Sequence, residues 1–463
     1  MEINEKYIAE IVEKVLKDTR ETETIKKQKG VFETMEEALA AVGKAYTEFR
    51  KYTIEQREQM IAKIREFTYA EAENLAKLGV EETGMGRVSD KIIKHQVVAD
   101  KTPGTEDLAT RAYSGDAGLT LVEMAPFGII GSITPSTNPS ETVICNTIGM
   151  IAGGNAVVFN PHPNAKKTSN YAVDMVNRAI LEAGGPENLV ASVANPTMDS
   201  TKEMMSAPSV KMLVATGGPG VVKALLSSGK KAIGAGAGNP PVIVDETADV
   251  EKAGRDIVLG ASFDNNLPCI AEKECFAVDS IADELIYHMT QNGAYLIKGK
   301  QIDELLKIAL VENKGKLGIN KKFVGRDAKK FLKEMGIDAD PRLIICETDF
   351  DHPFVQEELM MPILPIVRVK DVDTAIELAT KAEHGNRHSA HIHSKNIDNI
   401  TKFAKAVETT IFVKNAPSYA GIGVGGEGHT TFTIAGPTGE GLTSARSFTR
   451  QRRCVMVEAL HII

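Results

Sequence analysis

Hydrophobic and polar positions follow two different periods along this chain, and the alternation of the two predicts an α/β protein. Between residues 127 and 233, short apolar runs of strand length alternate with longer segments of helical spacing. Strand and helix in regular alternation are typical of a parallel, doubly wound sheet. The predicted strands are 127–134, 156–159, 189–193, 211–216 and 231–233, and the predicted helices between them are 141–152, 167–183 and 221–228.

The segments on either side of this region continue the same two patterns. Residues 34–94 have the apolar spacing of packing helices, whereas residues 113–126 resemble a strand that leaves the main sheet. Further along, residues 343–345 and 363–369 are apolar runs typical of strands, and residues 372–382 are helical in pattern. The α/β character is therefore expected over most of the chain.

Residues 2–17 have the pattern of an amphipathic helix, with Ile8, Ile11, Val12, Val15 and Leu16 on one face. Residues 18–30 are polar and charged, as in a flexible linker. A short tethered helix cannot bury its own apolar stripe, so we expect it to dock on a partner or, alternatively, to fold back on the main domain. Its polar face carries acidic as well as basic residues, which makes membrane binding the less favoured interpretation.

Composition excludes several classes of protein. A chain of 463 residues that is 43% hydrophobic can bury a large core in two or three domains. A net charge of −8 gives no basic footprint for nucleic acid, and no apolar run approaches the roughly 20 residues that span a bilayer. The five cysteines include no Cys-x-x-Cys pair, so we expect a cytoplasmic protein with neither a disulfide framework nor a zinc site and without a signal peptide.

Cys269 is the best candidate for a reactive thiol. Cys145, Cys275, Cys346 and Cys454 lie in apolar or strand-like segments, whereas Cys269 follows the polar, Pro-ended stretch 262–268. We expect a short helix to follow it, which would put the thiol at an exposed strand-to-helix bend near backbone N–H groups that favour the nucleophilic thiolate. The alternative is a small buried hydrophobe.

Three further segments carry possible chemistry, each with a plain structural alternative. Residues 216–220 (Thr-Gly-Gly-Pro-Gly) join a strand to a helix, where N–H groups bind phosphate, but a tight turn without a ligand explains them as well. Asn138 follows a strand and is either a donor to a developing oxyanion or a turn residue. In the histidine-rich run 384–393, His391 and His393 alternate as on one face of a strand, which we favour over a metal site.

Several of these residues together resemble the aldehyde dehydrogenase superfamily over residues 31–463. Asn138 in Thr-Pro-Ser-Thr-Asn-Pro, the Gly217-Gly218 turn, the glycine run 234–244, Cys269 and Glu358 occur in the order and spacing of that family. Within it, the sequence around Cys269 and residues 433–446 resemble the CoA-acylating branch, the propionaldehyde and acetaldehyde dehydrogenases of bacterial microcompartments. The resemblance implies an α/β fold of two doubly wound parallel-sheet domains plus a β oligomerisation flap.

The resemblance also implies a division of the chain and an assembly. The implied parts are a targeting helix at 1–18, a linker at 19–30, a dinucleotide-binding domain at 31–112 and 125–238, a catalytic domain at 239–430, and the flap at 113–124 and 431–463. The N-terminal helix is similar to the encapsulation peptide of such enzymes, which implies a microcompartment shell protein as its partner. A homodimer or homotetramer in the lumen of a bacterial microcompartment is the implied assembly.

Residue by residue, the resemblance implies a catalytic and a cofactor-binding set, with no metal. Cys269 is the implied nucleophile, and Asn138 with the Cys269 backbone N–H is the implied oxyanion hole. NAD and coenzyme A are the implied cofactor and co-substrate. Thr134 and Pro135 are assigned to the nicotinamide side, Asn160, Pro161 and His162 to the adenosine pocket, Thr216, Gly217 and Gly218 to the pyrophosphate, Gly236 to the nicotinamide, and Glu358 to its ribose.

Two departures from the hydrolytic members of the family shape the expected reaction. Those members carry Lys where this chain has Asn160, which leaves the choice between NAD and NADP open. They carry a general-base Glu where this chain has Ala235, and a positioned base is worth about 10²- to 10⁴-fold in rate. Without it, a CoA thiol becomes the better acyl acceptor than water.

The expected activity is therefore oxidation of a short-chain aldehyde, with propanal preferred, to its acyl-CoA in a reversible ping-pong cycle. A hydrolytic enzyme that makes the free acid is the alternative that Ala235 disfavours. Acetaldehyde or butanal as the main substrate stays open. A non-catalytic shell component is disfavoured by the presence of Cys269, Asn138 and Glu358 together.

Overall fold

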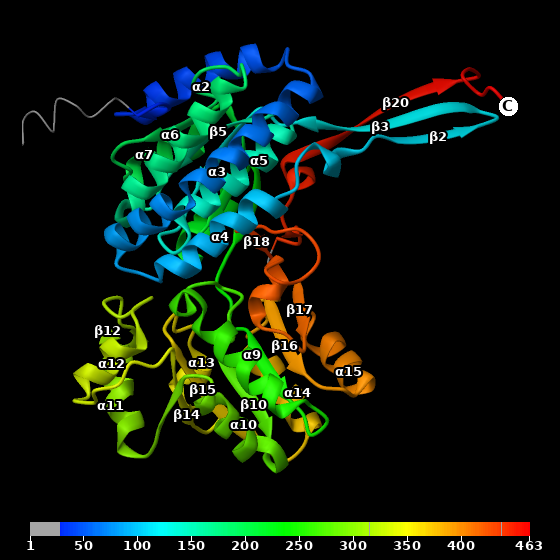
Figure 1. Cartoon of the computed structure of the whole chain (residues 1–463). Coiled ribbons are helices and arrows are strands. Elements are labelled where there is room, and N and C mark those ends of the chain that lie inside the picture. Colours follow the sequence, from blue (N-terminus) through cyan, green and yellow to red (C-terminus); the bar gives the residue numbers. More distant parts are fainter. Residues whose placement is uncertain (1–27, 314, 437) are drawn as a thin grey trace, which may run out of the picture.

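The computed structural model describes residues 28–313, 315–436 and 438–463, which form two stacked α/β lobes and a long β arm (Figure 1). The predicted helix at 1–18 and most of the linker at 19–30 lie outside the described residues. The end of that linker is joined to the first lobe, because the Lys29 N–H donates to Asp174 Oδ1 at 2.8 Å. No helix in the part of the chain that the structure describes is long and apolar enough to cross a membrane.

The first lobe contains a sheet of six parallel strands. Its order is β1 (Val31–Phe32), β6 (Val190–Val193), β5 (Ala156–Asn160), β4 (Ile129–Ile133), β7 (Val210–Thr216) and β8 (Lys231–Ala235). Its helices are α2 (Met35–Phe49), α3 (Ile54–Thr83), α4 (Val88–Lys101), α5 (Pro139–Ala152), α6 (Lys166–Glu182), α7 (Met198–Ser206) and α8 (Pro219–Leu226). Residues of β4, β5 and β6 are buried throughout, as expected of strands covered on both faces.

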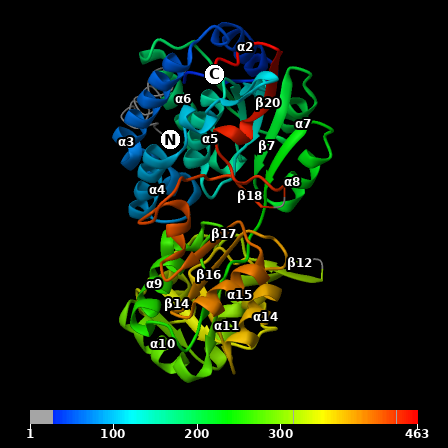
Figure 2. The same cartoon turned by 90° about the vertical axis from the view of Figure 1, so that its right-hand side faces the viewer.

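The second lobe contains a sheet of seven parallel strands (Figure 2). Its order is β11 (Ala294–Ile297), β14 (Leu343–Glu347), β15 (Ile363–Val369), β10 (Glu274–Val278), β9 (Pro241–Val244), β16 (Ser389–His393) and β17 (Ile411–Lys414). Its helices are α9 (Val250–Ser262), α10 (Asp279–Gln291), α11 (Lys300–Ala309), α12 (Ala328–Glu334), α13 (Pro353–Gln356), α14 (Val372–Ala382) and α15 (Ile397–Val407).

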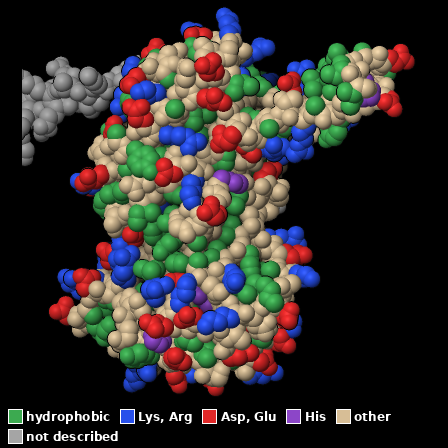
Figure 3. All heavy atoms as spheres, turned by 45° about the vertical axis from the view of Figure 1, so that its right-hand side comes forward, with side chains coloured by type: hydrophobic (Ala, Val, Ile, Leu, Met, Phe, Trp, Pro, Cys, Tyr) green, Lys and Arg blue, Asp and Glu red, His purple; other side chains and the backbone are tan. Residues whose placement is uncertain are grey.

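The arm is an antiparallel sheet made of two distant segments of the chain. The hairpin of β2 (Arg111–Gly115) and β3 (Gly118–Pro126) pairs with β20 (Thr449–Val457), so that β3 lies in the middle. Apolar side chains gather on its exposed surface, among them Tyr113, Val455 and Val457 (Figure 3). Smaller two-stranded ladders are β12 (Leu310–Asn313) with β13 (Lys316–Ile319) and β18 (Ile434–Ala435) with β19 (Gly441–Leu442).

This architecture confirms the predicted fold class of two parallel-sheet lobes with a separate β element. Five of the six first-lobe strands were predicted with small errors at their ends, since residues 211–216 correspond to β7 at Val210–Thr216, whereas β1 was not predicted. The short 3-10 helices were not predicted: η1 (Thr105–Leu108), η2 (Pro163–Ala165), η3 (Phe263–Asn266), η4 (Ser418–Ile422) and η5 (Ala445–Phe448).

Candidate active site

The order of strands in the first sheet makes the carboxyl ends of β4 and β7 a candidate ligand site. These strands are neighbours, with Ile133 opposite Ala215, yet the chain passes through β5 and β6 on one side before it returns to β7. Open α/β sheets bind ligands at such a reversal of strand order, where the loops on the two sides diverge. Thr134 follows β4 and Thr216 ends β7, so both lie beside this point.

All the predicted nucleotide-binding residues of the first lobe lie at this carboxyl edge. They end or follow four strands: β4 (Thr134, Pro135), β5 (Asn160, Pro161, His162), β7 (Thr216, Gly217, Gly218) and β8 (Gly236). A Cβ built on Gly218 or on Gly236 would meet no atom within 4 Å, so there is open space beside both. The Gly217 N–H donates to the Ala235 carbonyl at 3.2 Å and joins the two neighbouring turns.

Their side chains are not equally available to a ligand. The hydroxyl of Thr134 is buried and has no hydrogen-bond partner within the described residues. The amide of Asn160, in contrast, donates to Thr201 Oγ1 at 2.8 Å and accepts from Ser200 Oγ at 2.7 Å. His162 is exposed, and its Nδ1 accepts from the Asn164 N–H at 3.1 Å.

Cys269 lies in a turn between η3 and β10, and the prediction of a helix after it is wrong. Residues 269–270 form a turn, and β10 begins at Glu274. The thiol is half-buried rather than exposed, and it packs against the hydrophobic core of the first lobe. The nucleophile candidate therefore lies on a helix-to-strand connection, not on a strand-to-helix bend.

Side chains that capture the backbone of this turn explain why no helix forms. Asp264, Asn265 and Asn266 adopt left-handed φ angles of 48°, 56° and 65°, which Asn and Asp tolerate better than most residues. The Lys273 ammonium then binds the Asn266 carbonyl at 2.9 Å and the Pro268 carbonyl at 3.4 Å. Within this turn the Pro268 carbonyl also accepts the Ala271 N–H at 3.0 Å, at the i+3 spacing of a turn rather than the i+4 spacing of an α-helix.

Three residues from separate segments surround the Cys269 turn. Gly238, on the connection between the lobes, approaches so closely that a Cβ there would lie 3.1 Å from the Cys269 carbonyl and 2.8 Å from His388 Cγ. A hydrogen bond from the Gly238 N–H holds Glu358, which follows α13. The structure therefore brings both Glu358 and Gly238, which belongs to the predicted glycine segment, close to Cys269.

The sequence analysis did not assign a role to His388, which immediately precedes β16. Its Nδ1 contacts Ser389 Oγ at 2.8 Å, while its Nε2 is buried without a hydrogen-bond partner among the described residues. Burial, with a smaller contribution from Lys273, lowers the pKa of His388 to about 4. The only signal in the sequence was its place in the histidine-rich run, which does not distinguish it from its neighbours.

The rest of that run is structural. His391 and His393 lie on the buried strand β16, and His391 Nε2 contacts the Ile270 carbonyl at 2.9 Å, directly behind the Cys269 turn. The strand prediction for these residues is confirmed. Over residues 28–313, 315–436 and 438–463, no group of three His, Cys, Asp or Glu side chains is placed to hold a metal ion.

The electrostatic surroundings of Cys269 keep its thiol protonated in this structure. Burial raises the pKa of the Cys269 thiol to about 12, the negative charge of Glu358 adds to the rise, and Lys273 opposes it. Burial likewise raises the pKa of Glu358 to about 7. Perturbed groups that gather at a ligand edge are typical of catalytic sites.

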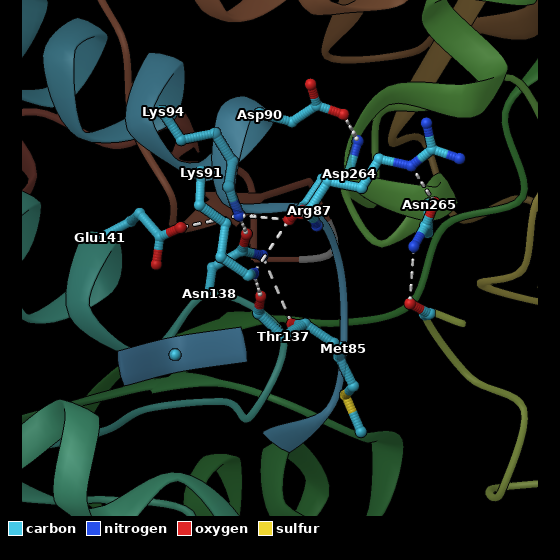
Figure 4. Close-up of polar contacts among 12 residues, drawn as sticks. Met85, Arg87, Asp90, Lys91, Lys94, Thr137, Asn138, Glu141, Asp264 and Asn265 are labelled. Carbon is cyan, nitrogen blue, oxygen red and sulfur yellow. Dashed lines mark hydrogen bonds and ion pairs between the residues drawn. The ribbon is translucent and has the colours of Figure 1, made fainter. Parts of the chain in front are cut away.

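Asn138 completes the site from the first lobe. It is the N-cap of α5, yet its side chain makes no capping hydrogen bond. Instead its Oδ1 accepts from the Lys94 ammonium at 2.6 Å, and within the described residues its NH₂ group donates only to Thr137 Oγ1, at 3.3 Å (Figure 4). A half-buried thiol, an amide with donor capacity and a ligand edge between two lobes are the parts of a covalent catalyst.

Comparison with known proteins decides which catalyst this is. The model of the aldehyde dehydrogenase family matches residues 9–444. The chain belongs to the aldehyde dehydrogenase family. This confirms the family resemblance that the sequence predicted.

Within the family, the chain groups with CoA-acylating enzymes. It is 46% identical to a CoA-propanoylating propanal dehydrogenase of Salmonella typhimurium, over 99% of this chain and 98% of that protein. It is 47% identical to an acetylating acetaldehyde dehydrogenase of Escherichia coli, over the full length of both. A propionaldehyde dehydrogenase from the fucose utilisation bacterial microcompartment of Clostridium phytofermentans superposes with a TM-score of 0.92 at 59% identity, covering 94% of this chain and 100% of that one.

Proposed function

We propose that this aldehyde dehydrogenase oxidises a short-chain aldehyde, preferably propanal, with NAD⁺ and transfers the acyl group to coenzyme A through a thioester on Cys269. The observation that carries the proposal is the half-buried Cys269 turn: Glu358 and Lys94 lie near enough to shift the pKa of its thiol, and Lys94 contacts the Asn138 amide. Position 235, where hydrolytic members carry a general base, is here a buried alanine at the end of β8. The similarity to CoA-acylating enzymes supports the same choice.

Open space at the carboxyl edge of the first sheet fits a dinucleotide. We assign Gly217 and Gly218 to the pyrophosphate, because they precede the N-terminus of α8 and Gly218 leaves room for close approach. The unpartnered Thr134 hydroxyl, with Pro135 and Gly236, borders the nicotinamide. When bound there, the nicotinamide supplies a hydride acceptor.

The adenosine pocket follows from the next strand. Pro161 and His162 border it, while the occupied amide of Asn160 shapes the pocket without offering a free donor. Asn160 thus cannot replace a lysine as a cationic contact. We propose NAD⁺ rather than NADP⁺, since neither Asn160 nor His162 supplies a permanent cation for a 2′-phosphate.

The chain's own groups then carry the chemistry. The Cys269 thiol gives its proton to water, and its sulfur attacks the aldehyde carbon as the C=O π bond opens. The resulting oxyanion accepts hydrogen bonds from Asn138 Nδ2 and the Cys269 N–H. Loss of hydride from that carbon leaves an acyl thioester on the sulfur. The CoA thiolate attacks the acyl carbon, the Cys269 sulfur leaves, and acyl-CoA is released. One thioester replaces another, so the sequence is reversible.

The experiment that tests this proposal measures NADH formation from propanal and NAD⁺, with and without CoA, for wild type and Cys269→Ala. We expect turnover that requires CoA and is lost in the variant, with propionyl-CoA as product. Equal turnover without CoA, with propionate accumulating, would replace the proposal with hydrolysis. The ratio of kcat/KM for propanal to that for acetaldehyde and for butanal tests the chain length, because the relatives named for propanal and for acetaldehyde are equally similar.

The assembly is a separate part of the proposal. We propose that residues 1–18 bind a microcompartment shell protein, on the strength of their amphipathic pattern and of the microcompartment named for the similar structure. The arm, with its exposed apolar residues, supports a homodimer or homotetramer. Deleting residues 1–18 is expected to abolish enclosure in a shell while sedimentation still reports the intact oligomer. Loss of the oligomer in that variant would contradict the division of roles.

A further inference from the structure

A buried ammonium lies directly behind the Asn138 amide. Lys94, on α4, is fully buried, and its Nζ lies 2.6 Å from Asn138 Oδ1, 2.7 Å from Glu141 Oε1 and 2.7 Å from Asp264 Oδ2 (Figure 4). Three oxygens from two lobes thus surround one cation. The two carboxylates raise the pKa of Lys94 above its ordinary value against the effect of burial, so the group stays charged.

This contact decides which way the Asn138 amide faces. An ammonium has only donors, whereas an amide has an oxygen at one end and an NH₂ group at the other. The oxygen must therefore face Lys94, and the NH₂ group must face away from it. Turning the amide over would place two donors against each other at 2.6 Å, beside a fully buried ammonium.

The same ammonium joins Asn138 to the segment that carries Cys269. Asp264 begins the left-handed run of the Cys269 turn, and its Oδ2 also accepts from Lys91 Nζ at 3.0 Å. Its Oδ1 accepts from the Arg87 N–H at 2.8 Å. The start of α4 therefore holds the amide on one lobe and the cysteine turn on the other in a single set of contacts.

We propose that Lys94 is a positioning residue for the oxyanion hole: it fixes the Asn138 NH₂ group toward the Cys269 side and sets its distance from the cysteine turn through Asp264. This proposal rests on the function proposed above, because it gives Asn138 and Cys269 their roles there. Lys94 itself does not touch the substrate. Its effect reaches the reaction only through the orientation of the amide.

The test is a double-mutant cycle of Lys94→Met and Asn138→Ala, with Lys91→Met as the matched control. Methionine keeps the length of the side chain and removes its charge and donors. The control removes the neighbouring lysine that shares Asp264 but has no contact with the Asn138 side chain within the described residues. The readout is the single-turnover rate of NADH formation without CoA, which isolates the steps in which the oxyanion forms and collapses. Thermal unfolding of each variant reports structural damage separately.

Loss of one oxyanion donor slows a reaction about 10²- to 10³-fold. An Asn138 amide that Lys94 no longer orients should cause part of that loss in rate. We expect Lys94→Met to slow NADH formation about 10- to 100-fold, Lys91→Met less than about 3-fold, and the double variant no more than Asn138→Ala alone. Both lysine variants should unfold at lower temperature. Losses that multiply in the double variant, or an equal loss in Lys91→Met, would overturn the positioning role while the function stands. A wild-type protein without Cys269-dependent NADH formation would overturn the function and this proposal together.

Discussion

Two buried clusters of charge flank the Cys269 turn, and they shift the pKa values of their carboxyl groups in opposite directions. On the N-terminal side, Lys91 and Lys94 face Asp264 and Glu141 at ion-pair distances of 2.7 to 3.0 Å. The charges match two for two. The nearby lysines hold the pKa of Glu141 at about 2 although its burial alone would raise it.

On the C-terminal side, one ammonium stands among several carboxyl groups. The Lys273 ammonium donates to the backbone carbonyls of the turn. Glu272 Oε2 and both carboxyl oxygens of Glu274 are buried without a hydrogen-bond partner in the described chain. Burial raises the pKa of Glu272 to about 7 and that of Glu274 well above its ordinary value. Glu358, also near Lys273, follows the same trend.

The difference teaches that the count of charges, and not burial itself, decides the state of a carboxyl group here. Both clusters are excluded from water, so burial disfavours the charged form in each. Paired cations overcome that cost on the first side, which then acts as a clamp between the lobes. The second side has too few cations, so its carboxyl groups take up protons near neutral pH, beside the sulfur that must change its own protonation.

The largest expected effect comes from breaking the matched cluster. Asp264→Asn keeps an oxygen for the Arg87 N–H but leaves Lys91 and Lys94 without their shared carboxylate, and removing one partner of a buried pair typically costs about 3–5 kcal/mol. Urea unfolding at pH 7 should show a loss of that size. The matched control is Glu274→Gln. Burial raises the pKa of Glu274 well above its ordinary value, and its carboxyl group has no ion-pair partner in the described chain, so a neutral amide should change the free energy of unfolding by less than about 1 kcal/mol. Equal losses in the two variants would remove the contrast between the clusters.

The next effect is an opposite pH dependence of stability in the two clusters. The folded-state pKa of Glu272, about 7, lies above the ordinary 4.5, so the folded protein loses stability as pH rises from 4.5 to 7. Above pH 8, the free energy of unfolding of Glu272→Gln should therefore exceed that of wild type by up to about 3 kcal/mol. The pKa of Glu141, about 2, lies below 4.5, so its contribution is complete above pH 4.5 and declines as pH falls toward 2.

Glu141→Gln should therefore be less stable than wild type by up to about 3 kcal/mol at neutral pH, with the gap narrowing below pH 4.5. Urea unfolding of wild type and both variants from pH 3 to pH 9 measures the two trends in one series. Curves that run parallel to wild type across the range would contradict the assignment of either group. If the advantage of Glu272→Gln over wild type in free energy of unfolding shrank with rising pH, the pKa of Glu272 would be shifted in the opposite direction.

The sequence predicted the framework of this site better than its charges. Strands β4, β5 and β6 follow from apolar runs because their burial is continuous along the chain, and the ligand edge follows from parallel order. Lys91 and Lys94 instead occupy a helical pattern in which lysine normally faces solvent. Their carboxylate Asp264 lies 173 residues from Lys91, and no local pattern records a partner at that distance.

The error at Cys269 has a different origin. A helix was the local prediction after the Pro-ended stretch, but the Lys273 side chain binds the Asn266 and Pro268 carbonyls from only seven and five residues away and holds a turn that begins with the left-handed residues 264–266. His388 was missed because its place beside Cys269 depends on β16 lying next to β9, a pairing across well over a hundred residues. Local patterns thus give most elements, whereas side-chain contacts, many of them between distant segments, give the chemistry.

The smallest expected effect concerns the thiol that lies beside the unmatched cluster. The Glu358 carboxylate raises the pKa of Cys269, so Glu358→Gln should lower the midpoint of thiolate formation by about one pH unit. The rate of Cys269 alkylation by iodoacetamide as a function of pH measures this midpoint, and the gain should appear above pH 7, where Glu358 is ionised. Glu357→Gln, one residue earlier, is the control, because Glu357 is not among the groups that shift the thiol. An unchanged pH dependence of alkylation in Glu358→Gln would mean that the Glu358 charge does not affect the pKa of the Cys269 thiol and that burial alone raises it.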